Sequence, residues 1–310
     1  MTVAPTAYYD QENGGKIPIF TPTWDEFKDF KAFVESIEEY GKESGIVKII
    51  PPKEWTSTDH YYGTTISIVR NKRQLHHISF DSETSNLTVD QYKEIERNYW
   101  RNITFNQPMY GADLLGTLFN SSITSWNPNT LDNTLNKLNQ TLPGVNSPYL
   151  YFGMWKATFA WHVEDMDLYS INYIHFGAPK QWYVVQPCHQ KRFETFMQLL
   201  ENNNIPIQRC VQQAGEFIIT YPFGYHSGYN LDFNCAESVN FAMDSWLEIG
   251  RKAKPCTCID DSVVIDVNSL FDGVLNSTVD HSTTTTTTTT TAKNKRKFDE
   301  ITRQENACPS

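Results

Sequence analysis

Five short runs of aromatic and β-branched residues follow one another in the middle of the chain, with glycine or proline between them. The runs lie at residues 149–152, 168–176, 182–185, 217–221 and 238–242. Runs of this length and composition are typical of β-strands, and the turn residues between them favour antiparallel pairing. We therefore predict a mainly β domain with flanking helices, built as a sandwich or barrel of the jelly-roll kind.

The segment before these runs contains a helix and a strand that are too short to form a core alone. Thr23 and Glu26 have the spacing of a capping box, and apolar residues then recur at helical spacing until Gly41, where we expect the helix to end. A β-branched strand follows at residues 46–50. We therefore predict that both elements pack on the strand-rich domain.

Further helices and a tail are indicated by the rest of the chain. Thr88 and Gln91 open a second capped helix, and amphipathic helices are expected near residues 191–201 and 244–254. After residue 276 a threonine tract and a basic cluster at 293–297 lack a hydrophobic pattern, so we expect this tail to be disordered. The basic cluster has the composition of a nuclear localisation signal, which it shares with ordinary solvated tails.

Charge and hydropathy exclude some classes of protein. The chain has 26 Lys and Arg against 36 Asp and Glu, a formal net charge of -10, whereas a sequence-independent nucleic-acid binder needs the opposite balance. An acidic surface suits a basic peptide partner, and it also serves solubility alone. No apolar run approaches the roughly 20 residues of a membrane span, and the first residues lack a signal-peptide pattern, so we expect a soluble intracellular protein with reduced cysteines.

One pair of side chains has the spacing of metal ligands. His162 and Glu164 are two residues apart and project from the same face if their segment is extended. His226 follows the predicted strand 217–221, and a jelly roll can bring it to that pair. Two imidazoles and one carboxylate on one side of an ion leave other positions open, as in non-haem iron(II) oxygenases. Zinc accepts the same ligands, and a His-x-Glu pair also occurs by chance.

The sequence around these residues resembles the JmjC domain of the histone lysine demethylases. The resemblance covers residues 148–185, which include ATFAWHVEDMDLYSINYIHFG, and residues 215–242, which include GEFIITYPFGYHSGYN. Residues 17–55 resemble the JmjN segment, with IPIFTPTWDEF and GIVKIIPPKEW. Residues 106–113 and 149–155 are similar to the JmjN-plus-JmjC subgroup that acts on trimethylated lysines nine and thirty-six of histone H3.

This resemblance implies a fold, a domain organisation and an activity. The fold is a double-stranded β-helix, of the jelly-roll or cupin-like kind, with a packed JmjN segment. The activity is Fe(II)- and 2-oxoglutarate-dependent removal of methyl groups from tri- and dimethylated histone H3 lysines, by N-methyl hydroxylation with dioxygen and release of formaldehyde. The implied segments are JmjN (17–58), a connection and helix (59–105), the JmjC catalytic domain (106–260), a C-terminal extension (261–276) and the Thr-rich, basic tail (277–310).

The resemblance also assigns roles to individual positions of this chain. The iron ligands are His162, Glu164 and His226. The residues that hold 2-oxoglutarate are Tyr110, Asn172 and Lys180, with Phe159 and Trp182 as apolar walls, although simple core packing explains these two aromatic residues equally well. The methyllysine pocket is assigned to Gly144, Tyr149, Tyr151, Glu164, Ser238 and Asn240.

The chain departs from the subgroup at two places. Val239 stands where a threonine is usual, which leaves the preferred histone lysine and methylation state open. The subgroup binds a structural zinc, and Cys256 and Cys258 match one half of that site, but the matching Cys and His pair is absent between Gln190 and Gln213. Cys188, His189 and Cys210 remain as substitutes, and we expect a degenerate zinc site.

Alternatives to a demethylase remain open at this point. A JmjC protein hydroxylase would add oxygen to its substrate without losing a methyl group, and a non-catalytic chromatin-binding module would hold a histone tail without changing it. The expected partners are the methylated histone H3 tail and, through other proteins, chromatin, without a sequence-specific DNA-binding module or a membrane. The expected location is the nucleus.

Overall fold

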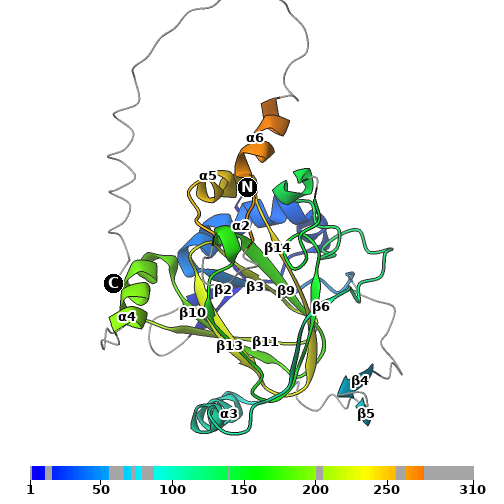
Figure 1. Ribbon diagram of the computed structural model, residues 1–310, viewed down its shortest axis with the longest axis vertical. Coiled ribbons are helices and arrows are strands. Elements are labelled where there is room, and N and C mark those ends of the chain that lie inside the picture. Colours follow the sequence, from blue (N-terminus) through cyan, green and yellow to red (C-terminus); the bar gives the residue numbers. More distant parts are fainter. Residues whose placement is uncertain are drawn as a thin grey trace, which may run out of the picture.

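Two β-sheets face one another in the computed structural model, and helices cover their outer surfaces (Figure 1). The structure describes residues 2–10, 16–55, 66–70, 74–78, 87–138, 140–199, 205–255 and 263–275. The predictions about Cys256, Cys258 and the tail 277–310 lie outside these residues.

The strands confirm a mainly β fold with a jelly-roll core. The larger sheet has eight strands in the order β1 (Ala7–Asp10), β2 (Lys16–Phe20), β3 (Ile46–Ile49), β12 (Phe217–Thr220), β9 (Tyr169–Gly177), β14 (Asn234–Phe241), β7 (Tyr149–Gly153) and β6 (Tyr110–Leu115). The smaller sheet has four, in the order β11 (Gln208–Gln212), β10 (Lys180–Val185), β13 (Tyr225–Asn230) and β8 (Thr158–His162). From β7 to β14 the chain alternates between the two sheets, except that β10 and β11 are neighbours in the smaller one. A separate hairpin of β4 (Ile66–Arg70) and β5 (Gln74–Ile78) lies in the predicted connection.

The segment that resembles JmjN extends the larger sheet. β2 and β3 pair in parallel, and β3 pairs antiparallel with β12, so that Ile49 lies opposite Phe217. Side chains alternate along β3: Val47 and Ile49 join the core outside the larger sheet, whereas Ile46 joins the core between the sheets. The prediction that this segment packs on the strand-rich domain is therefore confirmed.

The helices flank the sheets, and the capping boxes at Thr23 and Thr88 form as predicted. The α-helices are α1 (Trp24–Phe27), α2 (Phe30–Ser44), α3 (Val89–Asn102), α4 (Gln190–Leu199), α5 (Leu247–Gly250) and α6 (Val267–Leu275). The short 3₁₀ helices are η2 (Thr134–Lys137), η3 (Asp165–Asp167), η4 (Pro187–His189) and η5 (Asp244–Trp246). None of the helices in the described ranges has the length and hydrophobicity needed to cross a bilayer.

The first predicted helix differs from expectation at two points. It breaks before Asp29, whose side chain accepts a hydrogen bond from the Ala32 amide and so caps α2. It also continues past Gly41, because Gly45 supplies the left-handed residue that ends the helix, at φ +81°. Gly41 serves packing instead: a Cβ at that position would lie 1.9 Å from the ring of Tyr221.

The largest hydrophobic core lies between α2 and the outer face of the larger sheet. At its centre the rings of Phe27 and Trp126 stack with centroids 4.3 Å apart. Ile171 on β9 and Val239 on β14 point into this core. Because side chains alternate along a strand, the neighbours of these residues in sequence face the smaller sheet, and there they form the candidate site.

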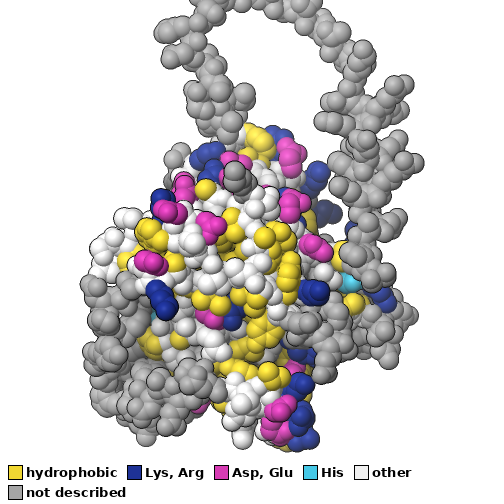
Figure 2. Space-filling view, turned by 180° about the vertical axis from the view of Figure 1, so that it is seen from behind, with side chains coloured by type: hydrophobic (Ala, Val, Ile, Leu, Met, Phe, Trp, Pro, Cys, Tyr) yellow, Lys and Arg dark blue, Asp and Glu magenta, His cyan; other side chains and the backbone are white. Residues whose placement is uncertain are grey.

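Charges of both signs are interspersed on the face seen in Figure 2, around a band of hydrophobic and uncharged side chains. Exposed ion pairs include Lys28–Asp25 and Arg251–Glu248. Such exposed pairs contribute little to stability.

Candidate metal and cosubstrate site

A polar cavity of about 120 Å³ lies between the two sheets. One part of the space between the sheets is filled by apolar side chains, among them Ile46, Val184 and Ile218. The cavity brings together all the predicted site residues except Tyr149, and it adds Ser170. The candidate site is therefore enclosed by strands of both sheets.

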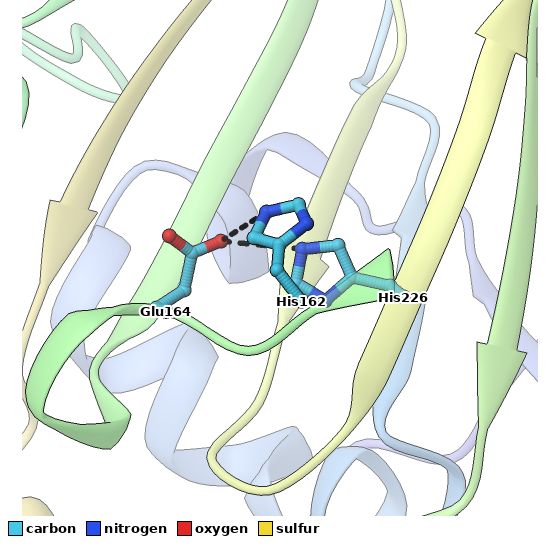
Figure 3. Close-up of side chains that lie close together, drawn as sticks. All are labelled: His162, Glu164 and His226. Atoms are coloured by element: carbon cyan, nitrogen blue, oxygen red, sulfur yellow. Dashed lines mark ion pairs between the residues drawn. The ribbon is translucent and has the colours of Figure 1, made fainter. Parts of the chain in front are cut away.

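His162, Glu164 and His226 converge at one wall of the cavity (Figure 3). One ligand atom from each lies within 4.8 Å of the other two. The Oε1 atom of Glu164 is 3.3 Å from His226 Nε2 and 3.9 Å from His162 Nε2. The two histidines are direct cross-strand partners on β8 and β13, whereas Glu164 lies just after β8, at the start of η3. The geometry thus brings the predicted ligands together, although Glu164 is not on a strand.

Backbone carbonyls orient both imidazoles. His162 Nδ1 lies 2.8 Å from the carbonyl oxygen of Ala160, and His226 Nδ1 lies 2.9 Å from that of Gly224. An imidazole that donates from Nδ1 keeps a lone pair on Nε2, which in both rings faces Glu164. The backbone therefore selects the tautomer that a metal ligand needs.

Electrostatics favour an ionised Glu164 carboxylate and a neutral His162 imidazole. Burial would raise the pKa of Glu164, but the nearby His226, His162 and Asn240 outweigh burial and lower this pKa to about 2. Burial, followed by the nearby His226, lowers the pKa of His162. Metal binding requires a deprotonated carboxylate and neutral imidazoles, so this wall suits a divalent cation.

Lys180 lies in the same cavity and is buried without a counter-ion. Its side chain is 2% exposed, and within the described part of the chain no hydrogen bond or ion pair involves its ammonium group. The ammonium lies 5.7 Å from the ring centroids of Phe159 and Trp182. Burial lowers its pKa to about 8. A buried cation without a partner is costly, so this arrangement suits an anionic ligand.

Two other side chains of the cavity, those of Asn172 and Tyr110, can also hydrogen-bond to a ligand. The Asn172 Oδ1 atom is buried and has no hydrogen-bond partner among the described residues. Burial raises the pKa of Tyr110, so its phenol stays protonated and can donate a hydrogen bond. These groups and Lys180 fit a carboxylate or keto-acid ligand beside the metal wall, the part of the cavity formed by His162, Glu164 and His226.

The predicted methyllysine residues, except Tyr149, line the same cavity as the metal and cosubstrate residues. Gly144, Tyr151, Ser238 and Asn240 line it. Tyr149 contacts Gly144: a Cβ at Gly144, where φ is +77°, would lie 2.4 Å from the Tyr149 ring. Tyr149 thus packs against Gly144, which lines the cavity, without lining it itself.

Val239 requires a correction. The sequence suggested that the replacement of threonine by valine bears on the methylation state. In the structure Val239 is 3% exposed and points into the core beneath α2, whereas its neighbours Ser238 and Asn240 line the cavity. The strand alternation therefore separates this position from the candidate substrate.

The structure removes two of the substitutes for the missing zinc ligands. Cys210 is fully buried in the core between the sheets, and burial raises the pKa of its thiol to about 12. Among the described residues, no group of three or more possible metal ligands includes Cys210. The other substitutes, Cys188 and His189, lie in η4, and Cys188 is disulfide-bonded. The expectation of reduced cysteines is therefore wrong for Cys188, which has no thiolate to offer a zinc ion.

Two residues at the site were missed by the sequence analysis. Ser170 lines the cavity and its Oγ lies 2.7 Å from Thr220 Oγ1. It stands two positions before Asn172 on β9, so the alternation along the strand was a signal that could have found it. Gln212 contacts the cavity wall from behind, at Trp182, and no motif marked it.

Comparisons with known proteins match the two segments that the sequence predicted. A family model described as "JmjC domain, hydroxylase" matches residues 149–203 and 197–241, and a model described as "jmjN domain" matches residues 18–51. Among curated relatives, lysine-specific demethylase 4B of Mus musculus is 40% identical over 306 residues, which cover 82% of this chain and 28% of the relative.

Two further relatives give similar values. Probable lysine-specific demethylase 4F of Homo sapiens is 37% identical over 312 residues, covering 84% of this chain and 49% of the relative. Lysine-specific demethylase 4D of Rattus norvegicus is 38% identical over 295 residues, covering 78% and 58%. The chain thus spans between 28% and 58% of the length of these relatives. The predicted resemblance is confirmed, and the chain belongs to the JmjC-domain family, in the group whose members also carry a JmjN segment.

Proposed function

We propose that this chain is an Fe(II)- and 2-oxoglutarate-dependent histone lysine demethylase. Its substrates would be tri- and dimethylated lysines of histone H3, at position nine, position thirty-six or both. The observation that carries this proposal is the buried Lys180 ammonium without a counter-ion, in the same cavity as the His162, Glu164 and His226 cluster. A metal wall and an unpaired cation together fit a metal ion and an anionic cosubstrate.

The residues of the cavity divide this task among them. His162, Glu164 and His226 would hold iron(II) and leave its other positions open. Lys180 and Tyr110 would bind the distal carboxylate of 2-oxoglutarate by charge-assisted and neutral hydrogen bonds, and Asn172 would hydrogen-bond to the same molecule. Iron(II), with 2-oxoglutarate and dioxygen, would supply the oxidation that hydroxylates an N-methyl carbon, after which formaldehyde is lost.

Oxygen-bearing side chains also line the cavity. Tyr151, Ser238 and Asn240 present phenol, hydroxyl and amide oxygens there. Methyl groups on a quaternary ammonium are polarised and form weak contacts with such oxygens, of about 0.5 to 1 kcal/mol each. Hydrogen abstraction from carbon needs no lone pair on nitrogen, so trimethyllysine is an accessible substrate.

The proposed partner is the basic, methylated tail of histone H3, which the acidic chain would attract. The resemblance to lysine-specific demethylases supports action on chromatin, with recruitment through other proteins, and hence a nuclear location. We also propose the domain boundaries given in the sequence analysis, with the JmjN segment at residues 17–58 and the catalytic domain at residues 106–260.

One assay separates the proposed activity from its alternatives. The purified chain is incubated with iron(II), ascorbate, 2-oxoglutarate and histone H3 peptides trimethylated at lysine nine or thirty-six, and the peptides are then weighed by mass spectrometry. Loss of methyl groups supports the demethylase. A stable gain of oxygen would indicate a protein hydroxylase, and peptide binding at unchanged mass would indicate a non-catalytic module.

A matched pair of variants connects the activity to the metal wall. Glu164→Gln removes the carboxylate ligand and should abolish both succinate formation and methyl loss. Glu248→Gln makes the same change at an exposed surface ion pair and should leave both unchanged. Demethylation by Glu164→Gln at the parent rate would refute the metal assignment.

A further inference from the structure

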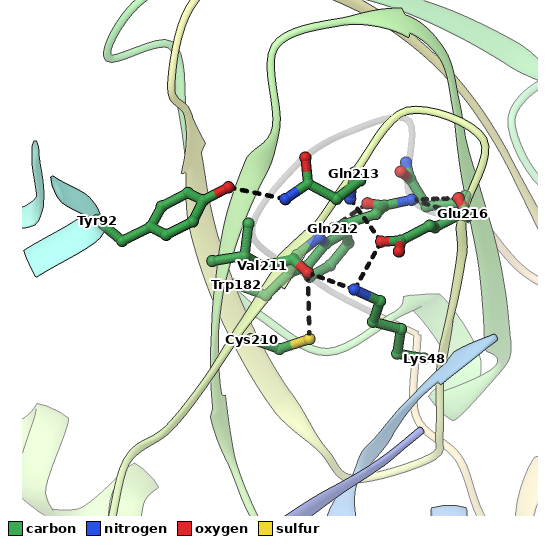
Figure 4. Close-up of polar contacts among 9 residues, drawn as sticks. Lys48, Tyr92, Trp182, Cys210, Val211, Gln212, Gln213 and Glu216 are labelled. Carbon is green, nitrogen blue, oxygen red and sulfur yellow. Dashed lines mark hydrogen bonds and ion pairs between the residues drawn. The ribbon is translucent and has the colours of Figure 1, made fainter. Parts of the chain in front are cut away.

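Gln212 forms a hydrogen-bonded bridge behind the candidate cosubstrate cavity (Figure 4). Its Oε1 atom accepts from the indole Nε1 of Trp182 at 2.9 Å. Its Nε2 atom donates to the carbonyl oxygen of Asn172 at 3.0 Å and to that of Glu216 at 2.9 Å. Gln212 is fully buried, so all these bonds form away from bulk water.

The bridge connects the two sheets. Trp182 and Gln212 belong to β10 and β11 of the smaller sheet, whereas Asn172 belongs to β9 of the larger one. Trp182 and Asn172 both line the cavity, from opposite sides. A single amide thus holds the indole of one wall and the backbone of the other wall.

A second connection runs from the JmjN segment to the turn at residues 213–216, which follows β11. The Lys48 ammonium on β3 lies 2.7 Å from Glu216 Oε2 and donates to the carbonyl oxygen of Val211 at 3.0 Å. The same Glu216 oxygen accepts from the Gln213 amide at 2.6 Å. Lys48 is 6% exposed, so this ion pair is buried and its strength depends on both partners. Lys48 therefore joins the larger sheet to the strand and turn that carry Gln212.

We infer that Gln212 is a positioning residue that fixes Trp182 and Asn172 relative to one another, and that Lys48 of the JmjN segment maintains this arrangement through Glu216. The inference rests on the proposed function, since Trp182 and Asn172 are assigned there to the cosubstrate. Rotation of the Trp182 ring would alter its contact with Lys180, 5.7 Å from the ring centroid, and with the His226 ring, whose centroid is 5.9 Å away. A displaced Asn172 would carry its unpaired Oδ1 atom out of place.

The test compares two buried glutamines on neighbouring strands. Gln212→Leu removes the bridge, whereas Gln181→Leu removes two buried amide hydrogen bonds, to the carbonyl oxygens of Trp182 and Cys210, without touching the Trp182 indole or Asn172. For each variant of this chain, 2-oxoglutarate is titrated into the iron(II)-loaded protein under nitrogen, and the Kd of 2-oxoglutarate is measured by calorimetry. Steady-state kcat and KM for 2-oxoglutarate and the thermal unfolding midpoint are also measured.

Gln212→Leu should raise the Kd and KM for 2-oxoglutarate about tenfold, with kcat at saturating cosubstrate within about twofold of the parent. Gln181→Leu should lower the unfolding midpoint comparably and leave the Kd within about twofold. Equal Kd values for parent and Gln212→Leu would overturn the inference alone. A parent chain that binds no 2-oxoglutarate would overturn the proposed function and this inference with it.

A double-mutant cycle tests the contribution of the JmjN segment. Lys48→Met and Glu216→Gln should each raise the Kd for 2-oxoglutarate several-fold. The Kd of the double variant should not exceed that of the weaker-binding single variant, because both changes remove the same ion pair. The double variant also avoids leaving a buried charge unpaired, so its Kd can be measured even if a single variant folds poorly. Parent affinity in the double variant, or strictly additive losses, would show that the ion pair does not act on the cavity.

Discussion

The side-chain amide of Asn240 donates a hydrogen bond to Glu164 Oε2 at 2.8 Å and leaves Oε1 of the same carboxylate facing both histidines. Asn240 also donates to the carbonyl oxygen of Tyr169, so its own orientation is fixed by the backbone of β9. This arrangement predetermines which carboxylate oxygen is free for a metal ion. Asn240, which the sequence analysis assigned to the methyllysine pocket, thus also contacts a candidate metal ligand.

Asn240→Ala should weaken metal binding. The Glu164 carboxylate would lose the donor that orients it, and outer partners of metal ligands are typically worth about 10- to 100-fold in affinity. Titration of iron(II) under nitrogen, followed by calorimetry, measures the effect. The exposed Asn136→Ala serves as the control, and an unchanged Kd for iron(II) in Asn240→Ala would contradict the orienting role.

Lys180→Met should bind 2-oxoglutarate much more weakly and yet be more stable than the parent. The parent buries an ammonium without a counter-ion, at a cost of about 3 kcal/mol if the pKa falls from 10.5 to about 8. Chemical denaturation should therefore show a higher free energy of unfolding for the variant at pH 7. Lys156→Met is the contrasting control, because the Lys156 ammonium donates to the carbonyl oxygens of Asn102, Phe105 and Asn106, and its loss should destabilise the fold.

The same pKa predicts a pH dependence with a definite sign. Because the pKa of Lys180 is about 8 in the folded chain, the ammonium loses its proton as the pH rises through that value, and the affinity for 2-oxoglutarate should fall. The folded pKa lies below the unfolded value of 10.5, so the unfolded chain binds more protons in between, and parent stability relative to Lys180→Met should rise from about pH 8 to pH 10.5. A stability difference that stays constant across this range would contradict the assigned pKa.

Gly144→Ala should impair the peptide without impairing the cosubstrate. A Cβ at this position would force the Tyr149 ring to move, because it would lie 2.4 Å away, and φ is +77°. We expect the KM for methylated peptide to rise about tenfold while the Kd for 2-oxoglutarate stays unchanged. Gly116→Ala is the matched control: it also adds a side chain at positive φ but meets only Leu150, at 3.5 Å. Equal peptide KM values for the two variants would show that Tyr149 does not contribute to substrate binding.

Neighbouring residues on β14 should behave oppositely. Val239→Thr buries a hydroxyl in the core beneath α2 and should cost about 1 to 3 kcal/mol of stability, while the mono-, di- and trimethyl product profile stays the same. Ser238→Ala removes a hydroxyl from the cavity wall and should change that profile. Quantifying all methylation states by mass spectrometry checks both, and a profile altered only by Val239→Thr would reverse the assignment of the two faces.

Local features of the chain could be predicted from the sequence because they depend on nearby residues. The capping boxes at Thr23 and Thr88 form as expected, and the runs of β-branched and aromatic residues become strands. β8 and β13, which carry His162 and His226, lay outside the predicted runs. In β13 the polar residues and Gly228 break the apolar pattern, whereas β8 contains no β-branched apolar residue. The His-x-Glu spacing pointed to His162, Glu164 and His226, and the family resemblance identified the other residues of the cavity.

The sequence by itself determined the β-rich class of the fold, the presence of the JmjN and JmjC segments and the identity of the candidate ligands. Only the tertiary structure decided that His162 and His226 are cross-strand partners, that Val239 faces away from the cavity, and that Gln212 joins the two sheets behind Trp182. The physical reason is that these relationships depend on strand register and sheet packing, which arise between residues far apart in the chain, and a shift of one residue in register would send each side chain to the opposite face.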